Sequence, residues 1–197
     1  MTNERRARLL SVIAKRQFDL AIVLENVFDP HNVSAVMRSC DAVGVQDIYI
    51  LNTKIPRHRK WGFRSGASAA KWLSIHQFDN VEACFAALRT RYKKIFTTHL
   101  NQEAVELHEI DFTERVAMVF GNEHAGVSDE ARALADGNFH IPQVGIIKSL
   151  NISVACAVTL YEAYRQKSIA GHYLPTEADS PLQRALKNQW GVDTNGI

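Results

Sequence analysis

Four segments of the chain combine polar side chains that could bind or activate a ligand. They are residues 29–38, 97–100, 121–126 and 141–151. Each lies at the end of a predicted strand and contains amide, hydroxyl, carboxylate or guanidinium groups. Segment 121–126, "GNEHAG", also has a glycine at both ends, and glycine lets the backbone come close to a ligand.

The common phosphate-binding loops are absent from the sequence. Neither G-x-G-x-x-G nor G-x-x-x-x-G-K-[ST] occurs. A dinucleotide or ATP site is therefore disfavoured. The glycine-containing and apolar loops "GNEHAG" and "IPQVGI" instead favour an adenosine group that is held by backbone amides and carbonyls.

The elements that must position these segments alternate between strand and helix. Strands are predicted over residues 20–27, 45–51, 73–78, 94–100, 115–120 and 139–142. Helices are predicted over residues 32–44, 65–72, 80–92, 128–135 and 149–168, with a further short helix at 182–190. This alternation predicts an α/β fold with a mostly parallel six-stranded sheet and helices on both faces. Since ligands bind beyond the carboxyl ends of such strands, the four polar segments are expected at one edge of the sheet.

Each polar residue also has a purely structural explanation. Asn32 and Asn151 are good residues for capping a helix, and Arg38 could pair with Asp41 one helical turn away. Glu123 could hold a neighbouring amide. The functional interpretation is favoured because all four segments converge on one sheet edge.

Composition limits the class of protein. The chain has 197 residues and a net charge of +2, which fits one large domain with short terminal additions. No apolar stretch is long enough to span a bilayer, and no secretory signal is present. Cys40, Cys84 and Cys156 lie apart in apolar segments, which predicts buried, reduced thiols in a cytoplasmic protein and no metal site.

Positive charge is concentrated in two places. The first 16 residues contain Arg5, Arg6, Arg8, Lys15 and Arg16. A second cluster, "KIPRHRKWGFR", interleaves Lys54, Arg57, Arg59, Lys60 and Arg64 with Trp61 and Phe63. Such patches suit a nucleic acid, although solvated surface segments would have the same composition.

Three longer segments resemble the motifs of a known family. "NVSAVMRSCDAVGV", "VFGNEHAGVS" and "IPQVGIIKSLNISVACAVTLYEAYRQ" are similar, in order and spacing, to the three motifs of the SPOUT superfamily of RNA methyltransferases. The match is to its branch of ribose 2'-O-methyltransferases, the SpoU or TrmH-like enzymes. The resemblance implies S-adenosylmethionine as cofactor, a C-terminal trefoil knot, and a homodimer with the last helix and the first-motif helix at its interface. It also implies a division into a basic helical extension (1–17), a methyltransferase domain (18–169) and a C-terminal extension (170–197).

The resemblance carries roles over to individual residues. Catalytic roles are implied for Arg38, Asn32, Glu123, Ser149 and Asn151. Cofactor contacts are expected from Thr98, His99, Leu100, Gly121, Asn122, Gly126, Ile141, Pro142 and Leu150. In the basic segments before the first strand and after the last helix, we expect RNA contacts from Arg8, Arg16, Arg165 and Lys167.

Within the branch, the chain most resembles enzymes that methylate guanosine 18 in the D-loop of tRNA. Its short basic extensions are typical of that group. The resemblance therefore implies transfer of a methyl group from S-adenosylmethionine to the ribose 2'-hydroxyl of that guanosine. Alternatives are another tRNA position, ribosomal RNA, or a non-catalytic RNA-binding scaffold. The scaffold is disfavoured because Arg38, Glu123, Ser149 and Asn151 are all present.

Overall fold

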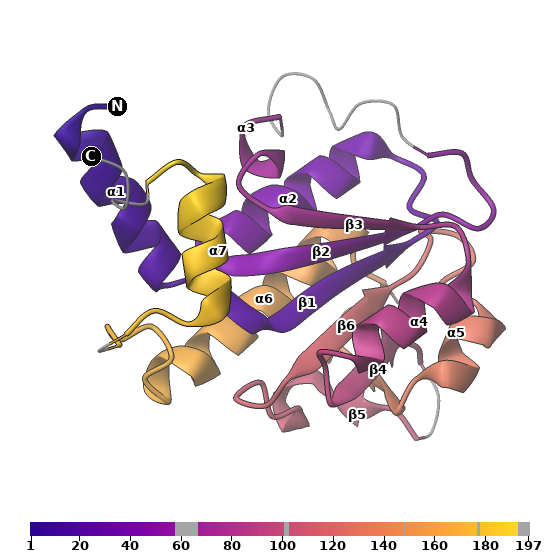
Figure 1. Ribbon diagram of the computed structural model, residues 1–197. Coiled ribbons are helices and arrows are strands. Elements are labelled where there is room, and N and C mark those ends of the chain that lie inside the picture. The colour runs from indigo at the N-terminus through magenta and orange to yellow at the C-terminus, as the bar shows by residue number, and fades with distance from the viewer. Residues whose placement is uncertain (58–66, 101–102, 148, 177, 193–197) are drawn as a thin grey trace.

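The computed structural model describes residues 1–57, 67–100, 103–147, 149–176 and 178–192. Seven parallel strands form one sheet in the order β3-β2-β1-β6-β4-β7-β5 (Figure 1). The strands are β1 (Gln17–Glu25), β2 (Val45–Leu51), β3 (Ser74–Phe78), β4 (Lys94–Thr98), β5 (Val105–Glu106), β6 (Val116–Phe120) and β7 (Gly137–His140). The helices are α1 (Asn3–Ala14), α2 (Pro30–Val43), α3 (Ala67–Ala70), α4 (Val81–Arg89), α5 (Asp129–Leu134), α6 (Ile152–Ile169) and α7 (Pro181–Gln189), with a 3₁₀ turn η1 (Leu107–Glu109).

The predicted parallel α/β architecture is confirmed, but the predicted strand number is wrong. The sheet has seven strands instead of six because β5 pairs with the outer side of β7. β5 is only two residues long, so it has no alternating or continuous apolar pattern that a sequence reading could detect. The basic residues 59–64 of the second cluster lie outside the described residues.

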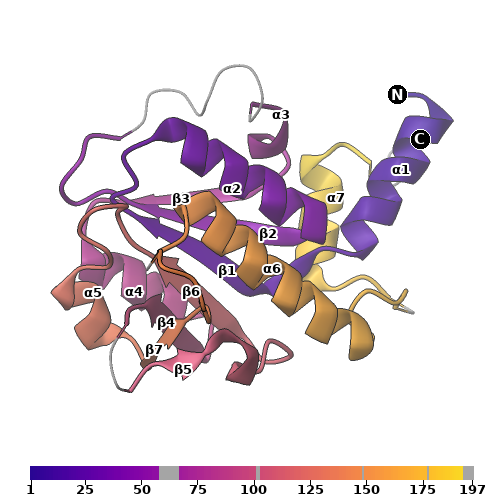
Figure 2. The same ribbon diagram turned by 180° about the vertical axis from the view of Figure 1, so that it is seen from behind.

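Helices cover both faces of the sheet because the side chains of β1 alternate between two cores. Leu20, Ile22 and Leu24 pack with α2 and α6 on one face. Ala21 and Val23 pack with α4 and α5 on the other. Figures 1 and 2 show the two helical layers from opposite sides. Both faces of the central strands are thus removed from water, which explains their nearly unbroken apolar sequences.

Helix α2 begins two residues before the predicted start, and Asn32 is not its cap. Asp29 is the N-cap, because its carboxylate accepts a hydrogen bond from the His31 amide at 2.8 Å. Pro30 occupies the first helical position, where its missing N–H costs nothing. The helix ends at Gly44, as predicted, with φ of 83°. The side chain of Asn32 is therefore free to bind elsewhere.

The two ends of the described chain pack together. The predicted helix at 182–190 is confirmed as α7, which lies beside α1 (Figure 1). Ile13 and Leu186 form a small core with Val192, and Phe18 and Trp190 pack against it. The segment after α6 thus docks on the chain's own first helix.

Two basic residues that were predicted to contact RNA are buried. The Arg16 side chain is 1% exposed and pairs with Asp41 at 2.5 Å. The Lys167 side chain is also 1% exposed, and its Nζ lies 2.8 Å from Asp19. Neither residue presents its charge at the molecular surface, so the prediction of surface RNA contacts for them is corrected. Their ion pairs instead join α2 to the start of β1, and α6 to β1.

Replacing Lys167 with alanine should strongly destabilise the fold. Burial lowers the pKa of Lys167 by more than the charge of Asp19 raises it, so the ammonium group depends on this ion pair. Removing Lys167 leaves Asp19 with only His172, at 3.3 Å, as an ion-pair partner, which should lower the free energy of unfolding by about 3 kcal/mol. Urea denaturation would measure this. Lys93→Ala is the matched control, because its pair with Glu114 is exposed and should contribute less than about 1 kcal/mol. Equal effects of the two substitutions would contradict the argument.

Candidate active site

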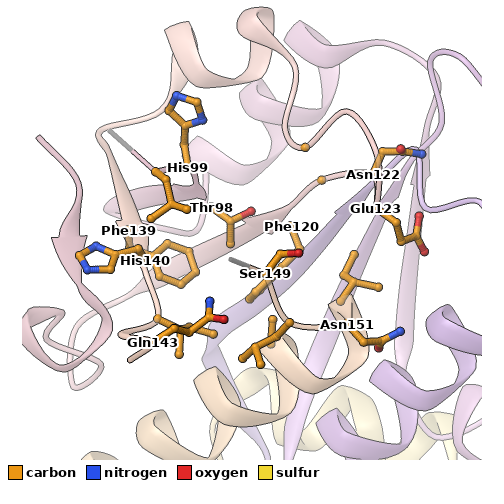
Figure 3. A pocket seen from close by; sticks show the side chains of 17 residues that line it. Thr98, His99, Phe120, Asn122, Glu123, Phe139, His140, Gln143, Ser149 and Asn151 are labelled. Carbon is orange, nitrogen blue, oxygen red and sulfur yellow. The ribbon is translucent and has the colours of Figure 1, made fainter. Parts of the chain in front are cut away.

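A cavity of about 560 Å³ lies at the carboxyl edge of the sheet (Figure 3). Its walls come from the ends of β4, β6 and β7, from the loops that follow them, and from the first turn of α6. It is lined by Thr98, His99, Leu100, Phe120, Gly121, Asn122, Glu123, Gly126, Phe139, His140, Ile141, Gln143, Ser149, Leu150, Asn151, Ile152 and Ala155. Three of the four polar segments therefore meet, as the parallel sheet predicts.

The cavity brings together most of the predicted site residues. Every residue predicted to contact a cofactor lines it except Pro142, and so do Glu123, Ser149 and Asn151. Asn32 and Arg38 are not lining residues. Sequence reasoning missed Phe120, Phe139, His140, Gln143, Ile152 and Ala155. Most of these lie inside the predicted elements, and the strand residues among them have apolar or strand-like patterns that signal burial rather than contact with a ligand.

The fourth polar segment joins the site through Asn32. Its side-chain amide nitrogen donates to Glu123 Oε1 at 2.8 Å. Its side-chain oxygen accepts from Asn151 Nδ2 at 3.3 Å. Asn32 thus joins its own segment to two others, which lie 91 and 119 residues later in the sequence. Glu123 does hold a neighbouring amide, and that amide belongs to Asn32.

Asn151 acts at the same time as the N-cap of α6. Its Oδ1 accepts from the Ser153 amide at 2.9 Å and from Ser153 Oγ at 2.6 Å. The predicted capping role is therefore confirmed. Because the cap uses the oxygen, the amide nitrogen remains available for Asn32. Capping and site assembly are not alternatives here, since one amide does both.

The glycines of the loop 121–126 serve the loop itself. The amide of Asn122 donates to the carbonyl of Gly126 at 3.0 Å, and the reverse bond is 2.9 Å. A Cβ at Gly121 would lie 2.1 Å from the carbonyl carbon of Gly126, so no side chain fits. Gly126 has φ of 67°, which favours glycine. We expected the glycines to allow close approach to a ligand, but at Gly121 the close neighbour is the loop's own backbone.

The side chain of Asn122 fixes this loop to β1. Its Oδ1 accepts from the amides of His124 and Ala125 at 2.8 and 3.1 Å. Its Nδ2 donates to the carbonyl oxygen of Asn26, just after β1, at 2.8 Å. Glu123 is therefore presented from a loop with a defined shape.

Comparison with known proteins identifies the family. A model of the SpoU rRNA Methylase family matches residues 19–161. The chain belongs to the SpoU methylase family.

Relatives of known name and structure cover nearly the whole chain. The tRNA (guanosine(18)-2'-O)-methyltransferase of Thermus thermophilus is 40% identical over 191 residues, which is 96% of each chain. The TrmH/SpoU tRNA modifying enzyme of Aquifex aeolicus has a TM-score of 0.85 and 36% identity, over 98% of each chain. The SpoU methyltransferase AviRb of Streptomyces viridochromogenes, solved with AdoMet, has a TM-score of 0.70 and 25% identity, and the match covers 78% of this chain and 59% of AviRb.

In this SpoU methylase, two histidines add polar groups to the cavity wall. His99 Nε2 lies 2.5 Å from Arg132 Nη1. Burial, and to a smaller extent the positive charge of Arg132, lowers the pKa of the His99 ring. His99 is therefore kept neutral near neutral pH. His140 Nδ1 is buried and has no hydrogen-bond partner among the described residues. Both rings can take up a polar group of a ligand.

Arg38 stands apart from the cavity of its own chain. It is exposed on α2 and makes no hydrogen bond or ion pair with the described residues. Asp41, its predicted partner, binds Arg16 instead. Six residues separate Arg38 from Asn32, which is about 9 Å along the helix and a different side of it. Arg38 is thus a free cation beside the site.

The other two predicted RNA contacts differ in their surroundings. Arg8 is exposed on α1. The Arg165 side chain is 59% exposed, but two of its nitrogens bind Glu162 at 2.8 and 2.9 Å. A phosphate at Arg165 therefore meets a charge that is already partly neutralised. Both residues remain accessible to RNA.

The loop glycines give a test of the site's construction. Gly121→Ala should destabilise the protein by several kcal/mol, because the loop backbone must move to relieve the clash. Gly126→Ala introduces no clash, and its positive φ should cost only about 1–2 kcal/mol. Thermal and urea unfolding of the two variants would compare them. A larger effect at Gly126 would show that the backbone angle, not the close approach at Gly121, limits this loop.

Proposed function

We propose that this SpoU methylase transfers a methyl group from S-adenosylmethionine to the ribose 2'-hydroxyl of guanosine 18 in tRNA. The observation that carries the proposal is the 40% identity to the Thermus thermophilus enzyme over 191 residues. An alignment of that length includes nearly all of the two terminal helices as well as the catalytic domain. The site described above supplies the groups that the reaction needs.

The cavity fits S-adenosylmethionine. Its volume of about 560 Å³ lies in the range of small-molecule sites. Phe120 and Phe139 pack edge-on at 5.8 Å and provide an apolar wall, and His140 offers an unpaired nitrogen. The backbone around Leu100, Gly121 and Ile141 and the side chain of Leu150 would hold the cofactor, which supplies the methyl group on a sulfonium.

Arg38 is proposed to stabilise negative charge on the RNA. As the 2'-hydroxyl oxygen takes the methyl group and S-adenosylhomocysteine leaves, the hydroxyl proton would pass to the adjacent RNA phosphate or to a transiently neutral guanidinium. Negative charge therefore develops on the attacking oxygen. A guanidinium is a poor base because its pKa exceeds about 12. It is, however, a permanent cation with several donors, and a preorganised cation lowers the energy of a developing oxyanion. Arg38 would bind the adjacent phosphate and this oxygen.

The hydrogen-bonded chain Glu123–Asn32–Asn151 would position the reactants. Asn32 holds the loop of Glu123 against the start of α6, which keeps Ser149 and Asn151 at the cavity mouth. These residues would orient the ribose hydroxyl toward the methyl group, because correct orientation of the two reacting groups lowers the barrier to the reaction.

We further propose a homodimer in which Arg38 serves the partner's cavity. On α6, Val154, Val158 and Tyr161 are 47%, 38% and 56% exposed and lie on one face. The opposite face of α6 packs on α2 through Cys156, Leu160 and Ala163. An exposed apolar stripe on a helix is typical of a protein interface. A two-fold pairing across α6 and α2 would bring a free Arg38 to the second cavity.

Three further features are part of the proposal. The C-terminal part would be knotted, which is supported by the meeting of the loops 121–126 and 141–151 at one cavity. The division into residues 1–17, 18–169 and 170–197 is supported by the separate small core of α1 and α7. A cytoplasmic location fits the three free, buried cysteines. In the described part of the chain, no helix is both long and apolar enough to cross a membrane.

The direct test is methyl transfer from labelled S-adenosylmethionine to unmodified tRNA transcripts. Incorporation should occur and should disappear when guanosine 18 is replaced. Incorporation that survives the replacement would move the target to another tRNA position. Incorporation into ribosomal RNA alone would reassign the substrate, and no incorporation into either RNA would support the scaffold alternative.

Mixing two inactive variants tests the role of Arg38 across the dimer. Arg38→Ala removes the cation, and Thr98→Trp fills the cofactor cavity. Each alone should be inactive. If each site combines one chain's Arg38 with the other chain's cavity, random mixing should restore about a quarter of wild-type activity. The control is Arg38→Ala taken through the same mixing procedure without a second variant, and it should stay inactive. No recovery, with mixed dimers verified, would place Arg38 in its own chain's site, and an active Arg38→Ala variant would place it outside catalysis.

A further inference from the structure

A second cavity, of about 330 Å³, lies at the amino end of the sheet. Its lining residues come from α1, from the segment after α3 and from the end of α7, and they share no residue with the cofactor cavity. Figure 1 shows α1 and α7 side by side. It is lined by Arg5, Arg8, Leu9, Val12, Arg16, Asp41, Trp72 and Trp190. None of these residues takes part in the proposed methyl transfer, so the cavity needs its own explanation.

The cavity has an excess of positive charge with unused donors. Three guanidinium groups line it, and Asp41 is the only carboxylate among the lining residues. Arg16 Nη2 binds Asp41, but Arg16 Nε and Nη1 are buried without any hydrogen-bond partner among the described residues. An unpaired buried donor on a cation is costly. Because Asp41 already pairs with Arg16, the excess charge lies on the exposed side chains of Arg5 and Arg8, and an anion in the cavity would compensate it.

The same cavity has an aromatic wall. The rings of Trp72 and Trp190 lie 4.9 Å apart at 67°. The Arg16 guanidinium carbon is 5.4 Å from the centre of the Trp190 ring, so charge and aromatic surface are adjacent. Trp190 Nε1 is buried and also lacks an acceptor among the described residues. The rings of Trp72 and Trp190 are only partly buried, so a planar group could stack against them.

We infer that this cavity binds one unpaired nucleotide of the RNA substrate. Its phosphate would face Arg5 and Arg8, which are exposed on α1, and its base would lie against Trp72 and Trp190. Arginines that bind phosphate beside aromatic side chains that stack on bases are the usual means of holding single-stranded RNA. The inference rests on the proposed function, because it takes tRNA as the ligand.

The position of the cavity excludes some nucleotides of the tRNA as its ligand. β1 runs for nine residues between the amino and carboxyl edges of the sheet, which is about 30 Å. Within one subunit, the bound nucleotide is therefore not the methylated guanosine or its neighbour. Relative to the guanosine methylated in the same subunit, it belongs to another part of the folded tRNA, and the cavity would check the shape of the molecule as well as its local sequence.

Three variants separate this site from general electrostatic attraction. Arg8→Gln and Lys15→Gln each remove one charge from the same end of the chain, but Lys15 is exposed and does not line the cavity. Trp72→Leu removes stacking without changing charge. The dissociation constant for unmodified tRNA should rise about tenfold in Arg8→Gln and in Trp72→Leu, and less than about twofold in Lys15→Gln. Affinity for S-adenosylmethionine, which binds at the other edge of the sheet, should stay unchanged in all three.

Tryptophan fluorescence gives a direct signal. The chain has three tryptophans, so in a Trp61→Phe background only Trp72 and Trp190 emit. Unmodified tRNA should quench this emission, and Arg8→Gln should shift the quenching to higher tRNA concentration. Strong quenching by micromolar GMP or inorganic phosphate with no quenching by tRNA would overturn the inference in favour of a small-molecule site. Equal losses in Arg8→Gln and Lys15→Gln, with none in Trp72→Leu, would also overturn it.

The results of these binding experiments can be told apart from the result of the methyl-transfer test. Binding and quenching by tRNA without methyl transfer would refute the proposed activity and leave the nucleotide site standing. Normal methylation of guanosine 18 with unchanged tRNA affinity in Arg8→Gln and Trp72→Leu would refute the nucleotide site alone.

Discussion

The side chain of Asn32 makes the two hydrogen bonds on which the geometry of the site depends. One holds the loop of Glu123 at 2.8 Å and the other reaches Asn151, the cap of α6, at 3.3 Å. An amide is suited to this place because it donates and accepts at once, whereas a carboxylate would meet Glu123 with like charge. At the site, the side chain of Asn32 thus connects α2, which carries Arg38, with the loop of Glu123 and with the start of α6.

The sheet keeps its two candidate binding sites well apart. The carboxyl edge gathers loops rich in glycine and amides around a cavity suited to a small cofactor. The amino edge gathers arginines and tryptophans from the first and last helices. A large, folded RNA can touch both, while a short oligonucleotide cannot. Chemistry at one edge and recognition at the other is therefore a consistent division for an enzyme that modifies one ribose in a whole tRNA.

The sequence predicted those features that depend on local pattern. Apolar runs located six strands, Gly44 located the end of α2, and the polar segments at strand ends located the cavity. Features set by tertiary packing were not predictable. Residue type alone does not show whether a basic side chain is exposed or buried. The sequence therefore could not distinguish exposed Arg8 from buried Arg16 and Lys167. The choice of Asp29 over Asn32 as cap was missed for another reason. The sequence contained the signal, because Pro30 suits the first helical position, but Asn32 is also a good cap.

The pairing of α1 with α7 has a consequence for how the protein is made. Leu9, Leu10 and Ile13 are covered in part by Leu186, Trp190 and Val192, which lie more than 170 residues later. On the ribosome, the central sheet can assemble while the first helix still lacks its partner. The nascent chain therefore carries an apolar patch at its leading end through most of translation. Chaperones that bind such patches have a target here that vanishes only when the last helix emerges.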